Sequence, residues 1–233
     1  MNILGVAESA VRRIREEIIV GKLLPGSRLN EIELSERFGI SRPPLREAFR
    51  MLGNEKLVEF MPRRGTFVAP MSLEDGEQVY LARQMLECTA IDIIGQERTA
   101  SLAPLRDALA EAQRPPETLS VIEDFHAMSR FHVRLIELAG NRWLIYCHQS
   151  LQSCLARYQV MYLNLPGSHV LSVEEHRRVL SFLEDGQYEA AKQHLIAHLN
   201  RTRECLRDAM PSGFLEAEGS NERVQKTRSS RQG

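Results

Sequence analysis

The stretch that decides the fold is GISRPPLREAFRML, residues 39–52. Its apolar side chains recur at the i, i+3, i+4, i+7 spacing of one helix face, namely Leu45, Ala48, Phe49 and Leu52. Pro43 and Pro44 stand where the helix would begin, and proline is tolerated there because the first backbone N–H groups have no partner within the helix. The pattern predicts a packed helix with an exposed, proline-opened start.

The polar side of the same helix carries Arg42, Arg46 and Arg50, one at every fourth position. A helix N-terminus has a partial positive charge and can meet phosphate. In a DNA major groove arginine can form two hydrogen bonds to guanine, and other arginines hold phosphates. The same spacing is also typical of a solvated face, so the neighbouring elements must decide between the two interpretations.

Those neighbours are two more helices and a hairpin. The apolar spacing predicts a helix over 8–20, and Asn30 is placed to cap a short helix that Gly39 ends. The segments LVEFM (57–61) and TFVAP (66–70) read as two strands. Three helices followed by a hairpin indicate a winged helix-turn-helix, which favours the DNA-binding interpretation.

The hairpin adds basic groups. Arg63 and Arg64 lie beside Gly65 at its predicted tip, where they could reach a minor groove or the DNA backbone. Residues 1–70, the predicted DNA-binding domain, hold 12 Lys and Arg against 9 Asp and Glu, whereas residues 71–233 hold 18 against 22. The formal charges of +3 and −4 have opposite signs, which agrees with an anionic partner for the first part only.

Composition excludes several other classes of protein. The sequence has no run of about 18 apolar residues to span a bilayer and no secretory signal pattern at its start, so we expect a cytoplasmic location. The four cysteines, at positions 88, 147, 154 and 205, show no CxxC spacing. We expect them to be buried free thiols rather than disulfide partners.

Residues 33–58, ELSERFGISRPPLREAFRMLGNEKLV, and 62–68, PRRGTFV, resemble the winged-helix domain of GntR-type bacterial transcription regulators. The usual pattern there is LA-x-x-x-G-V-S-R-x-P-V-R-E-A-L, then L-x-x-x-G-L-V and a wing with R-G. The resemblance implies that Arg42 and Arg46 are the main DNA contacts and that Ser41 contacts phosphate. It also implies that Gly65 lets the wing backbone approach DNA.

Two departures from the family pattern stand out. Pro43 replaces a frequent threonine, which removes a hydroxyl and an N–H group that could hold phosphate. The run Asn54-Glu55-Lys56 replaces a turn that usually contains glycine. Neither departure removes an arginine, so fold and binding mode are expected to survive.

The second part of the sequence, residues 71–214, is predicted to be an all-α antiparallel bundle of six or seven helices. Helical patterns cover 72–96, 101–113, 117–139, 142–163, 172–184 and 187–209. Turn signals such as PP, GN and DG separate them. Residues 215–233 lack apolar periodicity and are expected to be disordered.

Three histidines of this bundle, His132, His176 and His198, share helix turns with core-facing residues. Three neutral imidazoles suit zinc or nickel and leave one coordination position open. From spacing alone, however, histidines that are satisfied in the core or exposed are the more common explanation.

Residues 129–141 and 174–199, around these histidines, resemble the FCD ligand domain of the FadR branch of the family. The resemblance implies that residues 71–214 form a domain that binds an effector and dimerises. In that pattern an aspartate and three histidines hold a divalent metal (zinc, nickel or manganese), and a small carboxylate effector commonly completes the site. Met128 occupies the aspartate position, four residues before His132, and a thioether is a poor ligand for these metals. Asp124 lies a further turn away. We therefore hypothesise a three-histidine site that is weaker than usual or is filled only with effector bound.

Arg83 and Glu87 resemble the R-x-x-x-E element of the first helix of this domain. Arg83 could face the cavity and pair with an effector carboxylate, or it could form an ordinary i,i+4 ion pair with Glu87. No role is evident from the sequence for His148 or His169.

The resemblance as a whole implies a ligand-responsive repressor, not an enzyme, that binds a palindromic DNA operator as a homodimer and responds to a small carboxylate. Two other functions stay open. A metal-free regulator could sense an acyl ligand, for which Met128 is a suitable lining residue. A three-histidine metalloenzyme is the third possibility, but the sequence has no HExxH or paired Glu-x-x-His motif.

Overall fold

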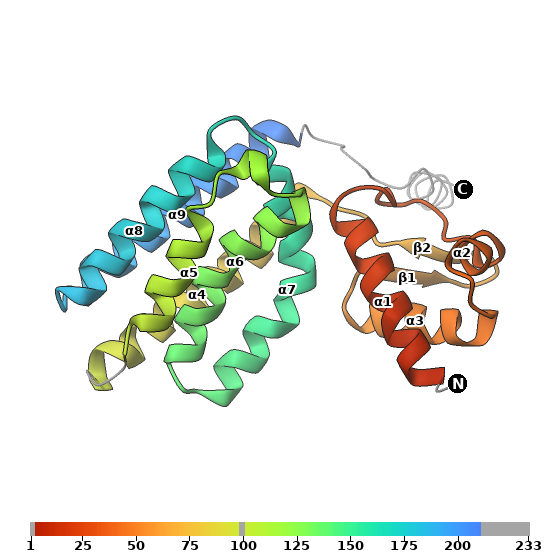
Figure 1. Cartoon of the computed structure of the whole chain (residues 1–233), viewed down its shortest axis with the longest axis horizontal. Helices are drawn as coiled ribbons and strands as arrows, with labels where there is room; N and C mark the ends of the chain where they lie inside the picture. The colour runs from red at the N-terminus through yellow and green to blue at the C-terminus, as the bar shows by residue number, and fades with distance from the viewer. Residues whose placement is uncertain (1–2, 98–100, 211–233) are drawn as a thin grey trace, which may run out of the picture. The chain divides into compact units, whose positions relative to one another are not determined.

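The computed structural model describes residues 3–97 and 101–210, which form two compact units. The first contains the chain up to Asp75, and the second is Gly76–Ala209. Each is a separate body, coloured from red to orange and from yellow to blue in Figure 1. The tail predicted for residues 215–233 lies outside the described residues.

The N-terminal unit is a winged helix-turn-helix, as the sequence predicts. It contains α1 (Ile3–Ile19), α2 (Glu31–Phe38), α3 (Arg42–Asn54), β1 (Val58–Met61) and β2 (Gly65–Val68). The two strands are antiparallel, and their register pairs the first residue of each with the last residue of the other. The stretch before α2 adds a short bridge from Arg28 to Phe67.

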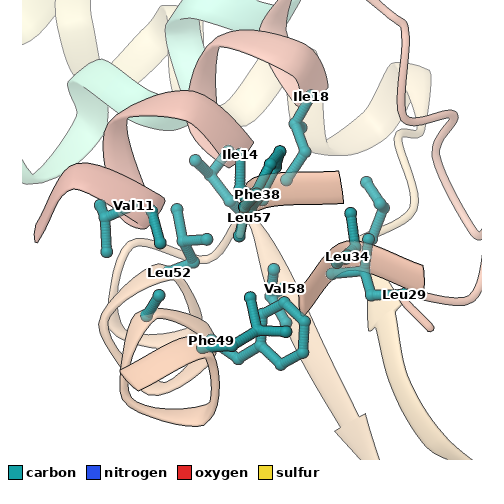
Figure 2. Close-up of a cluster of buried hydrophobic side chains, with 14 residues drawn as sticks. Val11, Ile14, Ile18, Leu29, Leu34, Phe38, Phe49, Leu52, Leu57 and Val58 are labelled. Carbon is teal, nitrogen blue, oxygen red and sulfur yellow. The ribbon is translucent and has the colours of Figure 1, made fainter. Parts of the chain in front are cut away.

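The core of this unit is one apolar cluster drawn from all three helices and the wing. Ile14, Leu52 and Leu57 are fully buried at its centre (Figure 2). Helix α1 begins at Ile3, earlier than the predicted start at residue 8, because its buried face continues through Ala7. The four apolar positions of α3 that define the predicted stripe are all buried.

Local sequence signals set the helix ends. The side-chain oxygen of Asn30 accepts hydrogen bonds from the backbone N–H of Ile32 at 3.0 Å and of Glu33 at 3.4 Å, which caps α2. Gly39 ends this helix with φ 65°, a left-handed conformation that glycine adopts without steric cost. The turn between α2 and α3 is therefore short, which fixes the direction of α3.

The C-terminal unit is an all-α bundle. Within the described residues it has six α-helices and one short 3-10 helix: α4 (Leu73–Glu97), α5 (Ala103–Ala112), η1 (Pro116–Thr118), α6 (Val121–Leu138), α7 (Arg142–Leu163), α8 (Ser168–Glu184) and α9 (Tyr188–Ala209). Helix α8 packs along α9, and α6 packs against both α5 and α7 (Figure 1).

Two helix starts in this bundle differ from the prediction by about one turn. Helix α6 begins at Val121 rather than 117, because Ser120 and Glu123 form a reciprocal capping box after the 3-10 turn. Helix α8 begins at Ser168 rather than 172, since Gly167 takes φ 78° and starts the helix directly after the loop. The added turn of α8 carries His169 into the bundle.

The cysteines are free, but the expectation that they are buried is wrong. Cys147 is exposed on α7 and the other three are partly exposed.

No helix within the described residues has both the length and the apolar composition that a membrane span requires.

Candidate nucleic-acid interface and metal centre

The start of α3 is open to solvent. Ser41 is the N-cap residue, but its side chain makes no capping hydrogen bond, so its hydroxyl is not used within the helix. Pro43 is exposed, whereas Pro44 is buried with the apolar face. The N–H groups that remain at this end, together with the Ser41 hydroxyl, can face an anion.

The three predicted arginines of α3 are all exposed. Arg46 donates from Nε to Glu31 Oε2 at 2.9 Å while its side chain stays 63 % exposed. Arg50 lies 3.3 Å from Glu47 and is 76 % exposed. Exposed ion pairs of this kind contribute little free energy and are screened by salt, so both guanidinium groups can exchange onto phosphate or base edges.

The wing is a tight turn with strained backbone at its tip. Arg64 N donates to Met61 O at 3.1 Å, and Arg63 takes φ 62° at the turn position that usually holds glycine or asparagine. Gly65 has φ 112°, and a Cβ there would lie 3.2 Å from the guanidinium of Arg28. Arg63, Arg64 and Arg28 are all exposed, so the tip presents three arginines. Sequence reasoning missed Arg28, whose only signal is its place just before the α2 cap.

The C-terminal unit brings His132, His176 and His198 together from α6, α8 and α9. All three are buried, and one ring nitrogen of each lies within 4.8 Å of the others. The Nε2 atoms of His132 and His176 are 2.9 Å apart. Of the two interpretations of their spacing, convergence is the observed one.

Two of these rings are oriented by carboxylates. His132 Nδ1 lies 2.8 Å from Glu87 Oε2, and His198 Nδ1 lies 2.6 Å from Glu175 Oε2. A carboxylate only accepts hydrogen bonds, so each Nδ1 carries the proton and each Nε2 keeps its lone pair. This is the arrangement that orients metal-binding histidines in proteins. Sequence reasoning gave Glu175 no role, although it directly precedes His176 in the E-H motif.

Arg83 both forms the i,i+4 ion pair with Glu87 and faces the cavity, the two roles considered for its motif. Its Nε donates to Glu87 Oε1 at 2.6 Å, and the pair is 3 % and 0 % exposed, so it is no ordinary surface pair. Arg83 also lines the cavity beside the histidines. Burial would raise the pKa of Glu87, but Arg83 and His132 hold it well below its usual value. His148, missed from the sequence, lies 3.6 Å from the same carboxylate.

The three histidines are held in the neutral form. Burial lowers the pKa of His132 to about 3, and the guanidinium of Arg83 acts in the same direction. Burial likewise lowers the pKa of His176 well below its ordinary value, with His132 adding to the effect. The pKa of His198 is also lowered by burial, although Glu175 opposes the shift. Neutral imidazole is the form that binds a metal ion.

Met128 lines the same cavity and is buried, with 3 % of its surface exposed. Asp124 does not join the histidines, because its Oδ1 is 2.7 Å from Nδ1 of His169. That buried pair links α6 to α8 and gives His169 the structural role that the sequence did not reveal.

The cavity is small, about 20 Å³. Its remaining walls are Tyr80, Gln159, Tyr162, Leu163, Ser172 and Thr202. Behind it, Arg201 donates from Nε to Glu175 Oε1 at 2.7 Å and also contacts the Tyr162 hydroxyl. Burial would raise the pKa of Glu175, but hydrogen bonds from His198 and Arg201 lower it to about 2.

The donor set fits a divalent metal. Ligand nitrogens around a tetrahedral zinc ion lie about 3.3 Å from one another, close to the 2.9 Å separation of two of these Nε2 atoms. His176 lacks a carboxylate on Nδ1, which is buried without a hydrogen-bond partner among the described residues. Its ring is positioned instead by stacking on Phe131, at 4.5 Å between centroids. Three nitrogen ligands are therefore available, and Met128 supplies no fourth.

Comparison with known proteins covers both units. Residues 6–68 match the family model of bacterial regulatory proteins of the gntR family, and residues 78–201 match the FCD domain model.

Among curated relatives, the HTH-type regulator YdhC of Bacillus subtilis is 29 % identical over 86 % of this chain and 91 % of its own. The HTH-type transcriptional repressor RspR of Escherichia coli is 25 % identical over 87 % and 89 %. A solved structure of a GntR-type regulator from Rhodococcus sp. RHA1 is similar in fold, with a TM-score of 0.76 and 24 % identity over 88 % of this chain and 99 % of that one.

Proposed function

The chain belongs to the GntR family of bacterial transcription regulators and carries an FCD domain, and from this premise we propose that it is a ligand-responsive repressor. In this proposal it binds a palindromic operator as a homodimer and responds to a small organic acid held beside a metal ion. The observation that carries the DNA-binding part is the proline-opened α3 with its exposed arginine row beside a basic wing. That RspR is named a repressor supports the direction of regulation.

On DNA, Arg42 and Arg46 read bases in the major groove from the start of α3. Ser41 and Arg50 contact the backbone, and the exposed helix start at Pro43 lets phosphate approach the free N–H groups. The arginines of the wing hold the adjacent minor groove or phosphates, and Gly65 lets the wing backbone come close. Each of these groups is exposed, so none must leave the core to bind.

The homodimer is supported by an uncharged surface on α4 and α7. From Gln78 to Ile91, the charged residues of α4 are Arg83 and Glu87, and both are buried. From Trp143 to Val160, α7 has one charged residue, Arg157, and it too is buried. The outward faces of both helices are therefore uncharged over several turns.

That uncharged surface also exposes large apolar side chains, the kind of surface that marks a contact with another protein. Exposed fractions are 46 % for Leu81, 65 % for Met85, 63 % for Trp143 and 65 % for Tyr146. The two helices are neighbours, since a Cβ on Gly76 of α4 would lie 2.8 Å from the ring of Tyr158 of α7. A second copy with the same surface would cover both by two-fold symmetry.

The effector part rests on the histidine cluster. His132, His176 and His198 would hold the metal, and Arg83 would pair with the effector carboxylate. When bound, the metal would supply a Lewis-acid position for a carboxylate oxygen. The effector shifts the protein toward a form that does not bind DNA, by as much as its affinity differs between the two forms.

The two other functions are less well supported. A metal-free acyl sensor needs room for a chain, and the cavity of about 20 Å³ does not provide it. A metalloenzyme needs a free general acid or base beside the metal. The nearby carboxylates, Glu87 and Glu175, are both held by an arginine and a histidine.

The proposal is tested by selecting bound fragments from a random duplex pool and measuring affinity for the selected and scrambled sequences by fluorescence anisotropy. Arg46→Ala should weaken binding to the selected sequence by about 1–3 kcal/mol and relax its specificity. Arg178→Ala, on an exposed arginine of α8, is the matched control and should leave both affinities unchanged. Equal losses on both sequences would assign Arg46 to phosphate, and no binding of any duplex at low salt would end the proposal.

A further inference from the structure

The charged groups around the cavity are already matched in pairs. The carboxylate of Glu87 is paired with Arg83 at 2.6 Å, and that of Glu175 with Arg201 at 2.7 Å. The histidines add no charge to this count, because an imidazole binds a metal ion in its neutral form. Two carboxylates and two guanidinium groups leave the surroundings of the three Nε2 atoms without net charge.

Because these charges cancel, the identity of residue 128 decides whether a bound metal ion has a negative charge beside it. It stands where the related pattern has an aspartate, and its thioether brings neither charge nor a good ligand for zinc, nickel or manganese. A divalent cation held by the three imidazoles would therefore carry two positive charges with no anion in its coordination sphere. Burying charge without a partner is costly.

The neighbouring carboxylates cannot easily correct this imbalance. Each carboxylate already accepts hydrogen bonds on both of its oxygens. Glu87 accepts from Arg83 and His132, and Glu175 accepts from Arg201 and His198. Asp124 is engaged with His169, at 2.7 Å. The missing negative charge must come from a molecule that enters from solution.

We infer that a divalent metal and a small anion bind this cavity as a linked pair, each raising the affinity of the protein for the other, because Met128 supplies no charge. The inference rests on the metal centre of the proposed function and adds to it an order of dependence between the two ligands. By thermodynamic linkage, the factor by which the anion tightens metal binding equals the factor by which the metal tightens anion binding.

The walls indicate the class of anion. The three histidines themselves line the cavity, and its volume of about 20 Å³ is close to that of one or two water-sized groups, so only a small anion can share it with a metal ion. Arg83 uses Nε for Glu87, so its other N–H groups are not committed to that ion pair and can donate to a carboxylate oxygen. Met128 and Leu163 offer apolar contact to a short aliphatic substituent. The fitting ligand is a small monocarboxylate.

The test uses full-length protein stripped of metal with a chelator and then dialysed. Co²⁺ is titrated and followed by its visible absorption, in sodium acetate or in sodium perchlorate of equal ionic strength. The pH is held at about 6, because water bound to a three-histidine zinc ion has a pKa of about 7. At higher pH the hydroxide formed from that water could take the place of the added anion. Met128→Asp restores the charge, and Met128→Leu, which keeps an apolar side chain without sulfur, is the control.

Acetate is expected to raise the Co²⁺ affinity of the unmodified protein by about tenfold or more, within the usual range of coupling between sites. Met128→Asp should bind Co²⁺ at least about tenfold more tightly in perchlorate, and acetate should then change its affinity by less than about threefold. Met128→Leu should behave like the unmodified protein.

Three results would overturn the inference. Equal Co²⁺ affinity of the unmodified protein in acetate and perchlorate, with Met128→Asp still binding Co²⁺, would remove the linkage and leave the metal centre standing. Loss of Co²⁺ binding in Met128→Leu would make the sulfur a ligand. The unfolding temperature of each variant shows whether it is folded. If neither the unmodified protein nor any folded variant bound Co²⁺, the metal centre itself would be ruled out. Duplex binding by the same samples tests the regulator separately.

Discussion

Arg63, at the tip of the wing, combines a strained backbone with a proposed role in DNA binding. Its φ is 62°, in the left-handed region, where a side chain costs about 1–2 kcal/mol relative to right-handed backbone. Arg63→Gly removes that cost, although the greater freedom of glycine in the unfolded chain returns about 0.5–1 kcal/mol. We expect this change to stabilise the N-terminal unit by up to about 1.5 kcal/mol.

The same substitution should weaken DNA binding. Loss of one phosphate contact reduces the slope of log affinity against log salt by about 0.9 for each wing. Lys56 is the matched control, because its φ of 61° is nearly the same and it lies at the end of α3, away from the arginine row. Lys56→Gly should therefore stabilise the unit by a similar amount and leave the salt slope unchanged.

Lys56 also explains how the chain does without the usual glycine in this turn. Leu57 N donates to Leu52 O at 3.0 Å, and Lys56 N donates to Gly53 O at 3.1 Å, the two bonds of a Schellman-type helix end. The lysine takes the position in which glycine is normally found, so replacement should relieve strain without breaking a contact.

The two stability changes must be read from the N-terminal unit itself. The one tryptophan, Trp143, lies on α7 in the other unit, so tryptophan fluorescence would miss them. Hydrogen exchange of backbone amides in peptides covering 43–55 reports on the α3 core, and anisotropy at several salt concentrations gives the slope. If neither glycine variant slowed exchange, the strain argument would be wrong. If Arg63→Gly slowed exchange but left the slope intact, Arg63 would not contact DNA.

Three further outcomes are expected. Glu175→Gln, which weakens the hold on His198, should lower Co²⁺ affinity by about 10- to 100-fold, measured by the same titration, and an unchanged affinity would remove Glu175 from the site. Met85→Glu places a charge on the uncharged α4 face and should shift the protein to monomers in sedimentation at micromolar concentration, whereas an unaltered dimer would put the interface elsewhere. Gly76→Ala should destabilise the C-terminal unit by about 1–3 kcal/mol, because its Cβ would lie 2.8 Å from the Tyr158 ring. Urea unfolding followed by Trp143 fluorescence measures this loss, and an unchanged free energy of unfolding would mean that the ring moves away without cost.

The fold could be predicted because its signals are local. The i, i+4 apolar spacing, the Asn30 cap and the Gly39 stop each act within one or two turns of chain, and each is observed. The errors are local too. The capping box at Ser120 and the left-handed Gly167 moved two helix starts by about one turn, a normal uncertainty of boundaries read from sequence.

The candidate site was only partly predictable, because its contacts span long stretches of sequence. The motif spacing indicated His132, His176 and His198, and the structure brings them together. No periodicity reveals that Glu175 turns to His198, or that Asp124 is taken by His169 forty-five residues away. Those partners depend on how α6, α8 and α9 pack, which is a property of the folded bundle.

Arginine–glutamate pairs serve opposite purposes in the two units. Arg46 and Glu31 lie 2.9 Å apart at 63 % and 30 % exposure, whereas Arg83 and Glu87 lie 2.6 Å apart at 3 % and 0 %. The distances are nearly equal, so solvent decides what each pair can do. Water competes for the first pair and its arginine can leave for a phosphate at little cost. The second pair has no such competitor, and removing one partner would strand a buried charge. Arg83 is thus held where an anion must come to it, while Arg46 is free to move to its anion.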